Sequence, residues 1–236
     1  RRSRSRLRCV SFSLIEDIQS GLKNFSDEEE LMRAACSVDC DGHKGVVRFD
    51  AVISAARAYV EHRMKAWPQP VELYYIDTFL KKNTKGHVSN EIDFGVQVMG
   101  SSDSALTAQV IYLAHKILQD HGLLELYTVQ INHIGSPESR EIYIEDLRNF
   151  YFDKQLSITD QAIQDYERGD LLRLLRYDDE DMQILAQLAP KLENYLTKED
   201  REQYQQLKKY LDELGVTYHE NPSLFGVGQY NAYTVI

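Results

Sequence analysis

The most constraining feature of this sequence is a strand pattern followed directly by a helix pattern within residues 90–120. Apolar residues alternate with small or polar ones along Glu91–Met99. This period of two predicts a half-buried strand in an antiparallel sheet. Gly100–Asp103 then breaks the strand and supplies residues that favour a helix N-terminus. Apolar residues at helical spacing follow, and Gly122 is placed to end the helix.

The two faces of the predicted strand have different compositions. One face is apolar, and we expect it to pack inside the fold; it consists of Ile92, Phe94, Val96 and Val98. The other face carries Asp93, Gly95 and Gln97. Because glycine lets a ligand approach the backbone closely, the polar face predicts either the floor of a ligand site or a solvated sheet surface.

Length and composition fit one large domain, or a domain with a subdomain, because 43% of the 236 residues are hydrophobic. No stretch approaches the ~18 consecutive apolar residues of a transmembrane helix, so no membrane span is expected. The three cysteines are an odd number. Reduced thiols in the cytoplasm are therefore the expectation, with a metal site at Cys36, Cys40 and His43 as the alternative.

The net charge is −10, although five arginines lie within the first eight residues. The acidic remainder argues against a broad nucleic-acid footprint. The arginine-rich start leaves an organellar transit peptide, an arm for anionic surfaces or a basic edge open. It lacks the apolar core of a secretory signal.

Patterns along the chain predict a mixed α/β (α+β) fold. Strands are expected at residues 9–16, 45–49, 71–79, 91–99, 126–134 and 216–219, and helices at 27–35, 51–65, 104–120 and 137–152. The strands at 71–79 and 91–99 predict a long antiparallel hairpin. Residues 154–214 show no strand pattern and predict a helical insertion, whose last helix begins after Thr197.

Catalytic signatures are missing from these patterns. The sequence has no phosphate-binding loop with Lys-Ser/Thr, no His-Glu-x-x-His and no Gly-x-Ser-x-Gly. His62, His115 and His133 stand singly, so we interpret them as structural or surface histidines rather than ligands. The acidic run Asp178–Asp181 is interpreted as a solvated turn or a helix start, with cation binding as the alternative.

Several segments in a fixed order carry a resemblance that covers residues 10–236. They are Ala58–His62 with Trp67–Ile76, Phe94–Asp103, Ile131–Gly135 with Arg140, Ala189–Leu192 with Tyr195–Leu196, and Leu211–Gly215 with Asn221–Pro222. Together they resemble bacterial histidyl-tRNA synthetases. The resemblance implies a class II synthetase fold, which is an antiparallel β-sheet flanked by helices with a helical insertion, and a tendency to dimerise. It divides the chain into a first catalytic-type part (1–152), the insertion (153–214) and a return to the sheet (215–236).

The ligand-holding segments of that family are altered in this sequence. The family's Arg-Pro-Glu-x-Thr segment, which holds histidine and ATP, corresponds to residues 48–52; Arg48 is kept, Asp50 is shorter than glutamate, and Val52 lacks the hydroxyl. In the Phe-Arg-x-Glu motif the arginine corresponds to Leu80 or Lys81, and the glutamate is absent.

Two further segments complete the implied pocket. The family's glutamine and glutamate, four residues apart, become Asp93 and Gln97, and its Arg-Gly-Leu-Asp-Tyr-Tyr segment becomes Gly226–Asn231 without the arginine. The remnant pocket positions are therefore Arg48, Asp50, Val52, Leu80, Lys81, Asp93, Gln97, Gly226, Gln229 and Tyr230. No intact catalytic residue and no metal site are expected.

The combined losses argue against aminoacylation by this chain alone. A charged hydrogen bond is worth roughly 1.5–3 kcal/mol, and losing one transition-state donor costs ~100- to 1000-fold in rate. Two arginines, an acid and the family's third motif are missing together. No cofactor is expected, although the family uses ATP with magnesium. Binding of tRNA is not expected either, because no anticodon-binding domain follows.

Three functions remain open. The first is a regulatory or structural subunit that works in a homodimer or a hetero-complex with another protein, similar in kind to the regulatory subunit of ATP phosphoribosyltransferase. The second is a pocket rebuilt, by drift or by design, as a binding module for another ligand or protein. The third is a synthetase fragment that keeps histidine or ATP binding. The cytoplasm is the expected location, with an organelle as the alternative.

Overall fold

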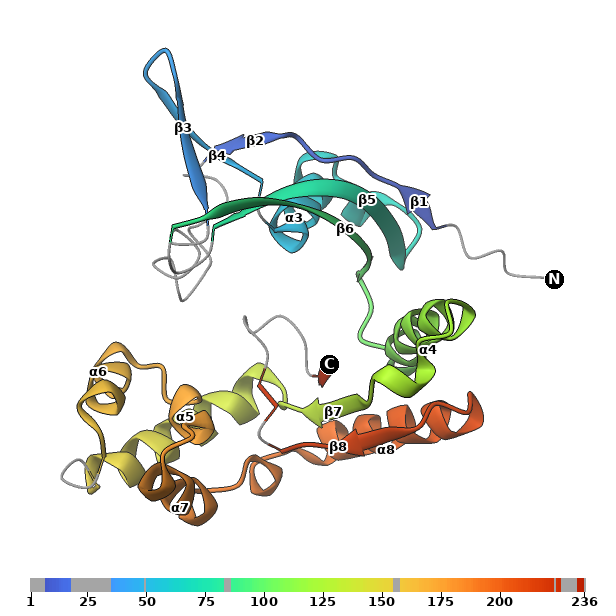
Figure 1. Ribbon diagram of the computed structural model, residues 1–236. Helices are drawn as coiled ribbons and strands as arrows, with labels where there is room; N and C mark the ends of the chain where they lie inside the picture. The colour runs from blue at the N-terminus through green and yellow to red at the C-terminus, as the bar shows by residue number, and fades with distance from the viewer. Residues whose placement is uncertain are drawn as a thin grey trace. The chain divides into compact units, whose positions relative to one another are not determined.

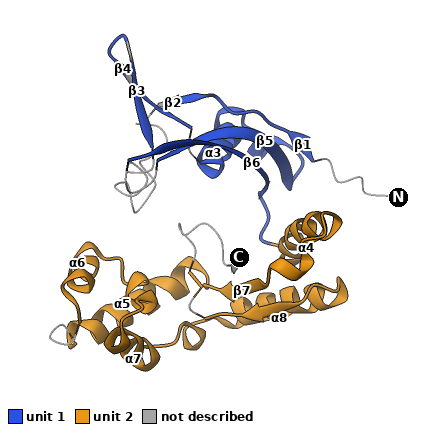
Figure 2. Cartoon of the chain, in the orientation of Figure 1, with its two compact units in different colours: residues 1–102 blue, residues 103–236 orange. Residues whose placement is uncertain are grey.

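The computed structural model describes residues 7–17, 35–48, 50–82, 86–154, 158–222, 224–225 and 233–235. The chain divides into two compact units, residues 1–102 and residues 103–236 (Figure 2). Residues 27–34 of the helix predicted at 27–35 lie outside the described residues. The three-part division drawn from the resemblance stays a prediction.

The first unit is built on a long hairpin. Strand β5 (Val71–Lys82) pairs antiparallel with β6 (Val88–Met99) along its whole length, and β1 (Arg8–Cys9) adds to β5 in parallel (Figure 1). The predicted hairpin is confirmed. Both strands extend beyond the predicted ends, because the ladder continues to the pair of Lys82 and Val88.

A second, antiparallel sheet of the first unit has the order β2 (Ile15–Asp17), β4 (His43–Val47), β3 (Cys36–Cys40). The single strand predicted at residues 9–16 is wrong, because the chain leaves one sheet after β1 and enters another at β2. Strand β3 was not predicted. The turn that joins it to β4 consists of Asp41 and Gly42, and both residues have positive φ.

Helix α3 (Ala51–Glu61) covers one face of the hairpin and is followed by the short 3₁₀ helix η1 (Met64–Ala66). Asp50 caps α3 by accepting hydrogen bonds from two backbone N–H groups. Two buried clusters lie here: Phe12, Ala51, Ala55 and Phe79 form one, and Met64, Val71 and Leu73 form the other. We call the hairpin face that carries Leu73 and Phe79 the inner face, and the opposite face the outer face.

The inner face also carries Asp93, Gly95 and Gln97, since the register pairs Gln97 with Leu73 and Gly95 with Tyr75. The prediction that the apolar face of β6 packs inside is wrong for its central residues, because Ile92 is 77% and Phe94 62% exposed. The physical reason is that α3 packs on the opposite face of the hairpin, where β5 contributes the buried apolar side chains Leu73 and Phe79.

In the second unit, β7 (Val129–His133) pairs in parallel with β8 (Tyr218–Glu220) and antiparallel with β9 (Tyr233–Val235). Helices α4 (Ser104–Asp120) and α8 (Lys198–Glu213), with the 3₁₀ helix η2 (Leu124–Leu126), complete this part. Their shared core contains Ile131, Leu207 and Leu211. The prediction for α8 is confirmed, because Thr197 forms a capping box with Asp200.

The rest of the second unit is helical, as predicted. It contains α5 (Pro137–Phe152), α6 (Asp160–Arg168), η4 (Arg173–Arg176), α7 (Glu180–Leu188) and η5 (Leu192–Asn194). These elements share a core of their own that includes Leu147, Tyr151 and Met182. Asp179 caps α7, which confirms a helix start in the acidic run. Among the described residues, no helix is long and apolar enough to cross a membrane.

Candidate functional site

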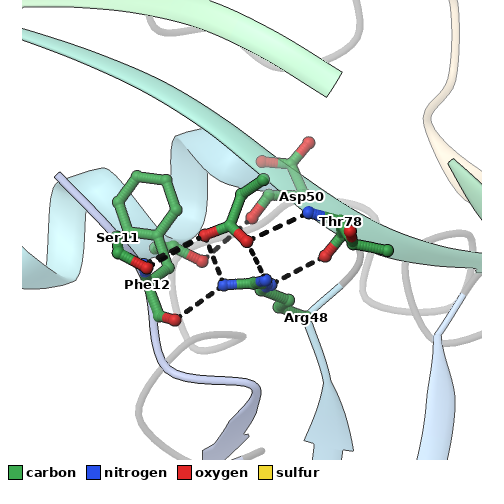
Figure 3. Close-up of polar contacts among 7 residues, drawn as sticks. Ser11, Phe12, Arg48, Asp50 and Thr78 are labelled. Atoms are coloured by element: carbon green, nitrogen blue, oxygen red, sulfur yellow. Dashed lines mark hydrogen bonds and ion pairs between the residues drawn. The ribbon is translucent and has the colours of Figure 1, made fainter. Parts of the chain in front are cut away.

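Arg48, which directly follows β4, is buried with 7% of its surface exposed. Its guanidinium forms a two-pronged ion pair with Asp77 of β5, in which Nη1 lies 2.6 Å from Oδ2 and Nη2 contacts Oδ1. Nη1 also donates to the carbonyl of Phe12 at 2.6 Å, and Nε donates to that of Thr78 at 2.8 Å (Figure 3). All three nitrogens of Arg48 therefore have partners inside the first unit.

Asp77 also accepts hydrogen bonds from three groups other than Arg48. The Ser11 hydroxyl donates to it at 3.3 Å, and the backbone N–H groups of Phe12 and Thr78 donate at 3.4 Å and 3.0 Å. Burial opposes its ionisation, but these hydrogen bonds and Arg48 hold the pKa of Asp77 below its ordinary value. Asp77 is thus a carboxylate at neutral pH that joins β5 to the segment before β2.

Lys81 lies on the inner face, where its Nζ is 2.9 Å from a carboxylate oxygen of Glu91 and 3.0 Å from one of Asp93. These hydrogen bonds raise the pKa of Lys81 and lower that of Glu91. Leu80 lies on the outer face, because neighbouring residues of a strand point to opposite sides. Lys81 therefore shares a face with Asp93 and Gln97, whereas Leu80 does not.

Tyr75 covers Gly95, its cross-strand partner. A Cβ atom at position 95 would collide with the phenol ring of Tyr75, which also contacts the rings of Phe12 and Phe79 at centroid distances of 5.5 Å and 5.8 Å. Burial raises the pKa of Tyr75, and the charge of Asp93 adds to this effect. The space that Gly95 leaves above the strand is therefore filled by the Tyr75 ring rather than left for a ligand.

The other predicted positions are more scattered. The carboxylate of Asp50 accepts hydrogen bonds from the backbone N–H groups of Val52 and Ile53, so it is engaged in capping α3. Val52 is 40% exposed in the first turn of that helix. Gln97 is half-buried on the inner face. Gly226, Gln229 and Tyr230 lie outside the described residues.

Sequence reasoning missed the contacts that hold the chain just before Gly226. The Asn132 side chain on β7 donates to the carbonyl of Leu224 at 3.0 Å, and Arg176 of η4 donates to that of Phe225 at 3.1 Å. Asn221 donates to Gln130 Oε1 at 2.7 Å. The alternating polar face of β7, with Gln130 and Asn132, was the available signal for two of these contacts.

A second buried carboxylate, Asp200, organises the second unit. It accepts hydrogen bonds from the backbone N–H groups of Ser136 and Thr197 and from the Ser139 hydroxyl. Burial opposes ionisation of Asp200, yet these hydrogen bonds lower its pKa. Next to it His133 is buried, its Nδ1 accepts the Gly135 N–H at 2.8 Å, and burial lowers its pKa. These contacts support the structural interpretation of His133.

Metal ligands do not gather in the described parts of the chain: no three His, Cys, Asp or Glu side chains there could hold one ion. Cys36 and His43 lie on neighbouring strands, where their registered partners are Val47 and Cys40. On the inner face, carboxylates of the chain itself pair with two cations. Asp77 binds Arg48, and Glu91 and Asp93 bind Lys81.

Comparison with known proteins decides the family. The family model for histidyl-tRNA synthetase matches residues 7–234. The chain belongs to the histidyl-tRNA synthetase family. It is 33% identical over 200 residues to a histidine–tRNA ligase of Lysinibacillus sphaericus, covering 83% of this chain and 47% of the relative. It is 30% identical over 236 residues to that of Caldicellulosiruptor saccharolyticus, covering 97% and 54%. The chain thus spans about half the length of these relatives.

Solved structures agree on the synthetase-like fold. Apo histidyl-tRNA synthetase of Staphylococcus aureus matches with a TM-score of 0.73 at 22% identity, covering 97% of this chain and 52% of that one. A Bacillus halodurans protein described as an ATP phosphoribosyltransferase regulatory subunit/histidyl-tRNA synthetase matches with a TM-score of 0.65 at 17% identity, covering 96% and 62%. The predicted fold class is therefore confirmed.

Within this histidyl-tRNA synthetase framework, the structure gives a specific account of the retained arginine. The resemblance implied that Arg48 is a remnant of a ligand-holding segment, whereas the geometry shows its guanidinium fork bound to Asp77. Asp77 was not among the predicted positions. It is the residue that changes the interpretation of Arg48, because it supplies the anion that the arginine binds.

Proposed function

We propose that this chain is a non-catalytic member of the histidyl-tRNA synthetase family that acts as a regulatory or structural subunit, through a homodimer or a hetero-complex. One observation carries the proposal. Both cations at described remnant pocket positions, Arg48 and Lys81, are paired with carboxylates of the chain itself. A pocket for ATP needs such charges to be available to phosphate oxygens.

The energetics favour the internal partners over a ligand. Removing one partner from a buried ion pair costs about 3–5 kcal/mol, whereas a charged hydrogen bond to a ligand returns roughly 1.5–3 kcal/mol. Freeing Arg48 from Asp77 for a phosphate is therefore unfavourable. Lys81 offers only a point charge in place of the planar arginine fork, and it already contacts two carboxylates.

The comparisons support a role that depends on association. The name of the Bacillus halodurans protein with the same fold combines a regulatory subunit with a histidyl-tRNA synthetase. A synthetase-like scaffold without its own catalysis fits that combination. The partner of this chain is then a second copy or another protein rather than tRNA.

Isothermal titration calorimetry with Mg-ATP, histidine and histidinol tests the proposal, together with ATP–pyrophosphate exchange. We expect no saturable binding of Mg-ATP and no exchange, while the Lysinibacillus sphaericus ligase gives both under the same conditions. Saturable micromolar binding of Mg-ATP would contradict the proposal. In that case Lys81→Ala shows whether Mg-ATP binds at the inner face, because a residual nucleotide pocket there loses affinity for Mg-ATP in this variant.

A further inference from the structure

The second unit contains two buried cores, and the chain passes from one to the other at the end of β7. Helices α5, α6 and α7 share the first core, and β7, α4 and α8 share the second. Ile131 of β7 belongs to the second core, whereas Ile134 already belongs to the first. The buried residue His133 therefore lies where the chain crosses between the two cores.

The carboxylate of Asp200, in the first turn of α8, joins the two parts of the unit. Its Oδ1 accepts the N–H of Ser136, the N-cap of α5, at 3.1 Å, and its Oδ2 accepts the Ser139 hydroxyl at 2.9 Å. Oδ2 also accepts the Thr197 N–H at 3.0 Å, which completes the capping box of α8. The N-termini of α5 and α8 thus share one buried carboxylate.

His133 is held in one neutral tautomer next to this carboxylate. It is 3% exposed, and its Nδ1 accepts the Gly135 N–H at 2.8 Å. Because a backbone N–H can only donate, Nδ1 carries no proton and the neutral ring carries its proton on Nε2. A second proton would enter at Nδ1 and set two donors against each other. The imidazolium form of His133 therefore cannot keep the hydrogen bond to Gly135.

The surroundings of His133 favour its neutral form. Burial lowers its pKa most strongly; Asp200 of α8 raises the pKa, and Arg140 of α5 lowers it. Tyr204 of α8 contacts the imidazole edge-on, with ring centroids 5.3 Å apart, and the registered residue of β9 is Tyr233. The pKa in an opened, solvated state is about 6.5. The closed arrangement is therefore favoured above about pH 6.5 and loses this advantage as the pH falls towards the lowered pKa of the closed state.

We propose that His133 is an acid-sensitive latch that holds the N-termini of α5 and α8 together when it is neutral and releases them when it is protonated. Protonation removes the acceptor of the Gly135 N–H. The imidazolium also competes with Ser136 and Ser139 for Asp200, because hydrogen bonds between charged groups are stronger than those from neutral donors. The latch is independent of the proposed function, since none of these residues is a remnant pocket position.

Hydrogen exchange of the full chain, followed by NMR between about pH 7.5 and 5.5, tests the latch. The exchange rates are converted to protection factors, so the intrinsic pH dependence of exchange is removed. We expect protection of the Gly135 and Ser136 amides to fall by up to about tenfold, because opening takes up one proton below about pH 6.5. Protection of the Leu211 amide, in the core shared by β7, α4 and α8, is expected to stay constant.

Two histidine variants show which side chain takes up the proton. His133→Asn offers an amide oxygen as acceptor but does not titrate, so protection of Gly135 and Ser136 should no longer depend on pH. The readout is the change with pH, which remains interpretable if this variant is less stable. The matched control is His115→Asn, because the imidazole of His115 on α4 pairs with the Tyr127 hydroxyl at 3.0 Å instead. The control variant should keep the acid response of the wild type.

Nitrogen-15 NMR of the imidazole gives a direct measurement. We expect His133 to carry its proton on Nε2 at neutral pH and to titrate below about 6.5. Three results would overturn the latch. They are constant protection of Gly135 and Ser136 in the wild type, an undiminished acid response in His133→Asn, and an equal acid loss at Leu211, which would mean that the whole unit unfolds.

Discussion

The two faces of the β5–β6 hairpin differ in residue composition and in whether their side chains are buried. The inner face carries charged residues, among them Asp77 and Lys81, and yet it holds the core side chains Leu73 and Phe79 under α3. The outer face is almost wholly apolar, and yet its central residues are exposed. Hydrophobicity along one strand therefore identifies its apolar face but does not decide which face is covered.

The difference follows from what each face meets. Helix α3 packs on the inner face through Ala51 and Ala55, and the chain around Phe12 adds to the same core. Covering the carboxylate of Asp77 there is tolerated because Arg48 and several hydrogen-bond donors lie within reach of it. The described residues of the first unit leave the central apolar side chains of the outer face, Ile76, Ile92 and Phe94, uncovered.

The largest expected effect concerns the inner ion pair. Asp77→Ala leaves the buried Arg48 guanidinium without its carboxylate and should lower the free energy of unfolding by about 3–5 kcal/mol. The measurement is urea denaturation followed by circular dichroism. Asp93→Ala, which removes an exposed partner of Lys81, is the control and should cost at most about 1 kcal/mol. Equal losses in the two variants would show that the inner pair is no more important than a surface pair.

A comparable effect should separate two phenylalanines of the same hairpin. Phe79 on the inner face is fully buried, so Phe79→Ala should cost about 3–5 kcal/mol. Phe94→Ala on the outer face should change the unfolding free energy of the monomer by less than about 0.5 kcal/mol. Both variants are compared at the same low protein concentration. A large loss for Phe94→Ala would mean that the chain itself covers the outer face.

A smaller effect is expected at Gly95. A methyl group there collides with the Tyr75 ring, so Gly95→Ala should destabilise the first unit by about 1–3 kcal/mol. In a Tyr75→Leu background the same substitution should cost clearly less, because the ring has been removed. Thermal unfolding of the four proteins in this cycle measures the coupling. Additive losses would contradict the packing of Tyr75 over Gly95.

The smallest effect is a pH dependence. The pKa of Asp77 is lowered in the folded state, so the unfolded chain binds a proton more readily in acid. Its stabilising contribution is complete above the unfolded pKa of about 3.9 and is lost as pH falls through the folded pKa. Asp77→Asn should therefore show a flatter loss of stability below about pH 5 than the wild type. Parallel acid profiles would exclude Asp77 as a source of that dependence.

Local signals predicted much of the fold. The helix predicted at 137–152 is α5, the helix predicted after Thr197 is α8, and the strand predicted at 126–134 contains β7. These signals act within a few residues, so a single sequence contains them. The hairpin was also predictable, because its two strand patterns follow each other closely along the chain.

The candidate site depended on contacts between residues far apart in sequence. Arg48 and Asp77 are 29 residues apart, and no local pattern indicates that they form a pair. Tyr75 meets Gly95 only because the register aligns them, and Lys81 rather than Leu80 reaches Asp93 for the same reason. A shift of one residue would have exchanged the two faces.

The sequence by itself determined which segments are strands and helices, the family resemblance and the substitutions at the remnant pocket positions. These properties follow from residue type and short-range spacing. Only the tertiary structure decided that the polar face of the hairpin is the covered one, that Arg48 is held by Asp77, and that the apolar face remains exposed. The physical reason is that burial and ion pairing depend on which segments meet in three dimensions, and this is fixed by strand register and by the packing of α3.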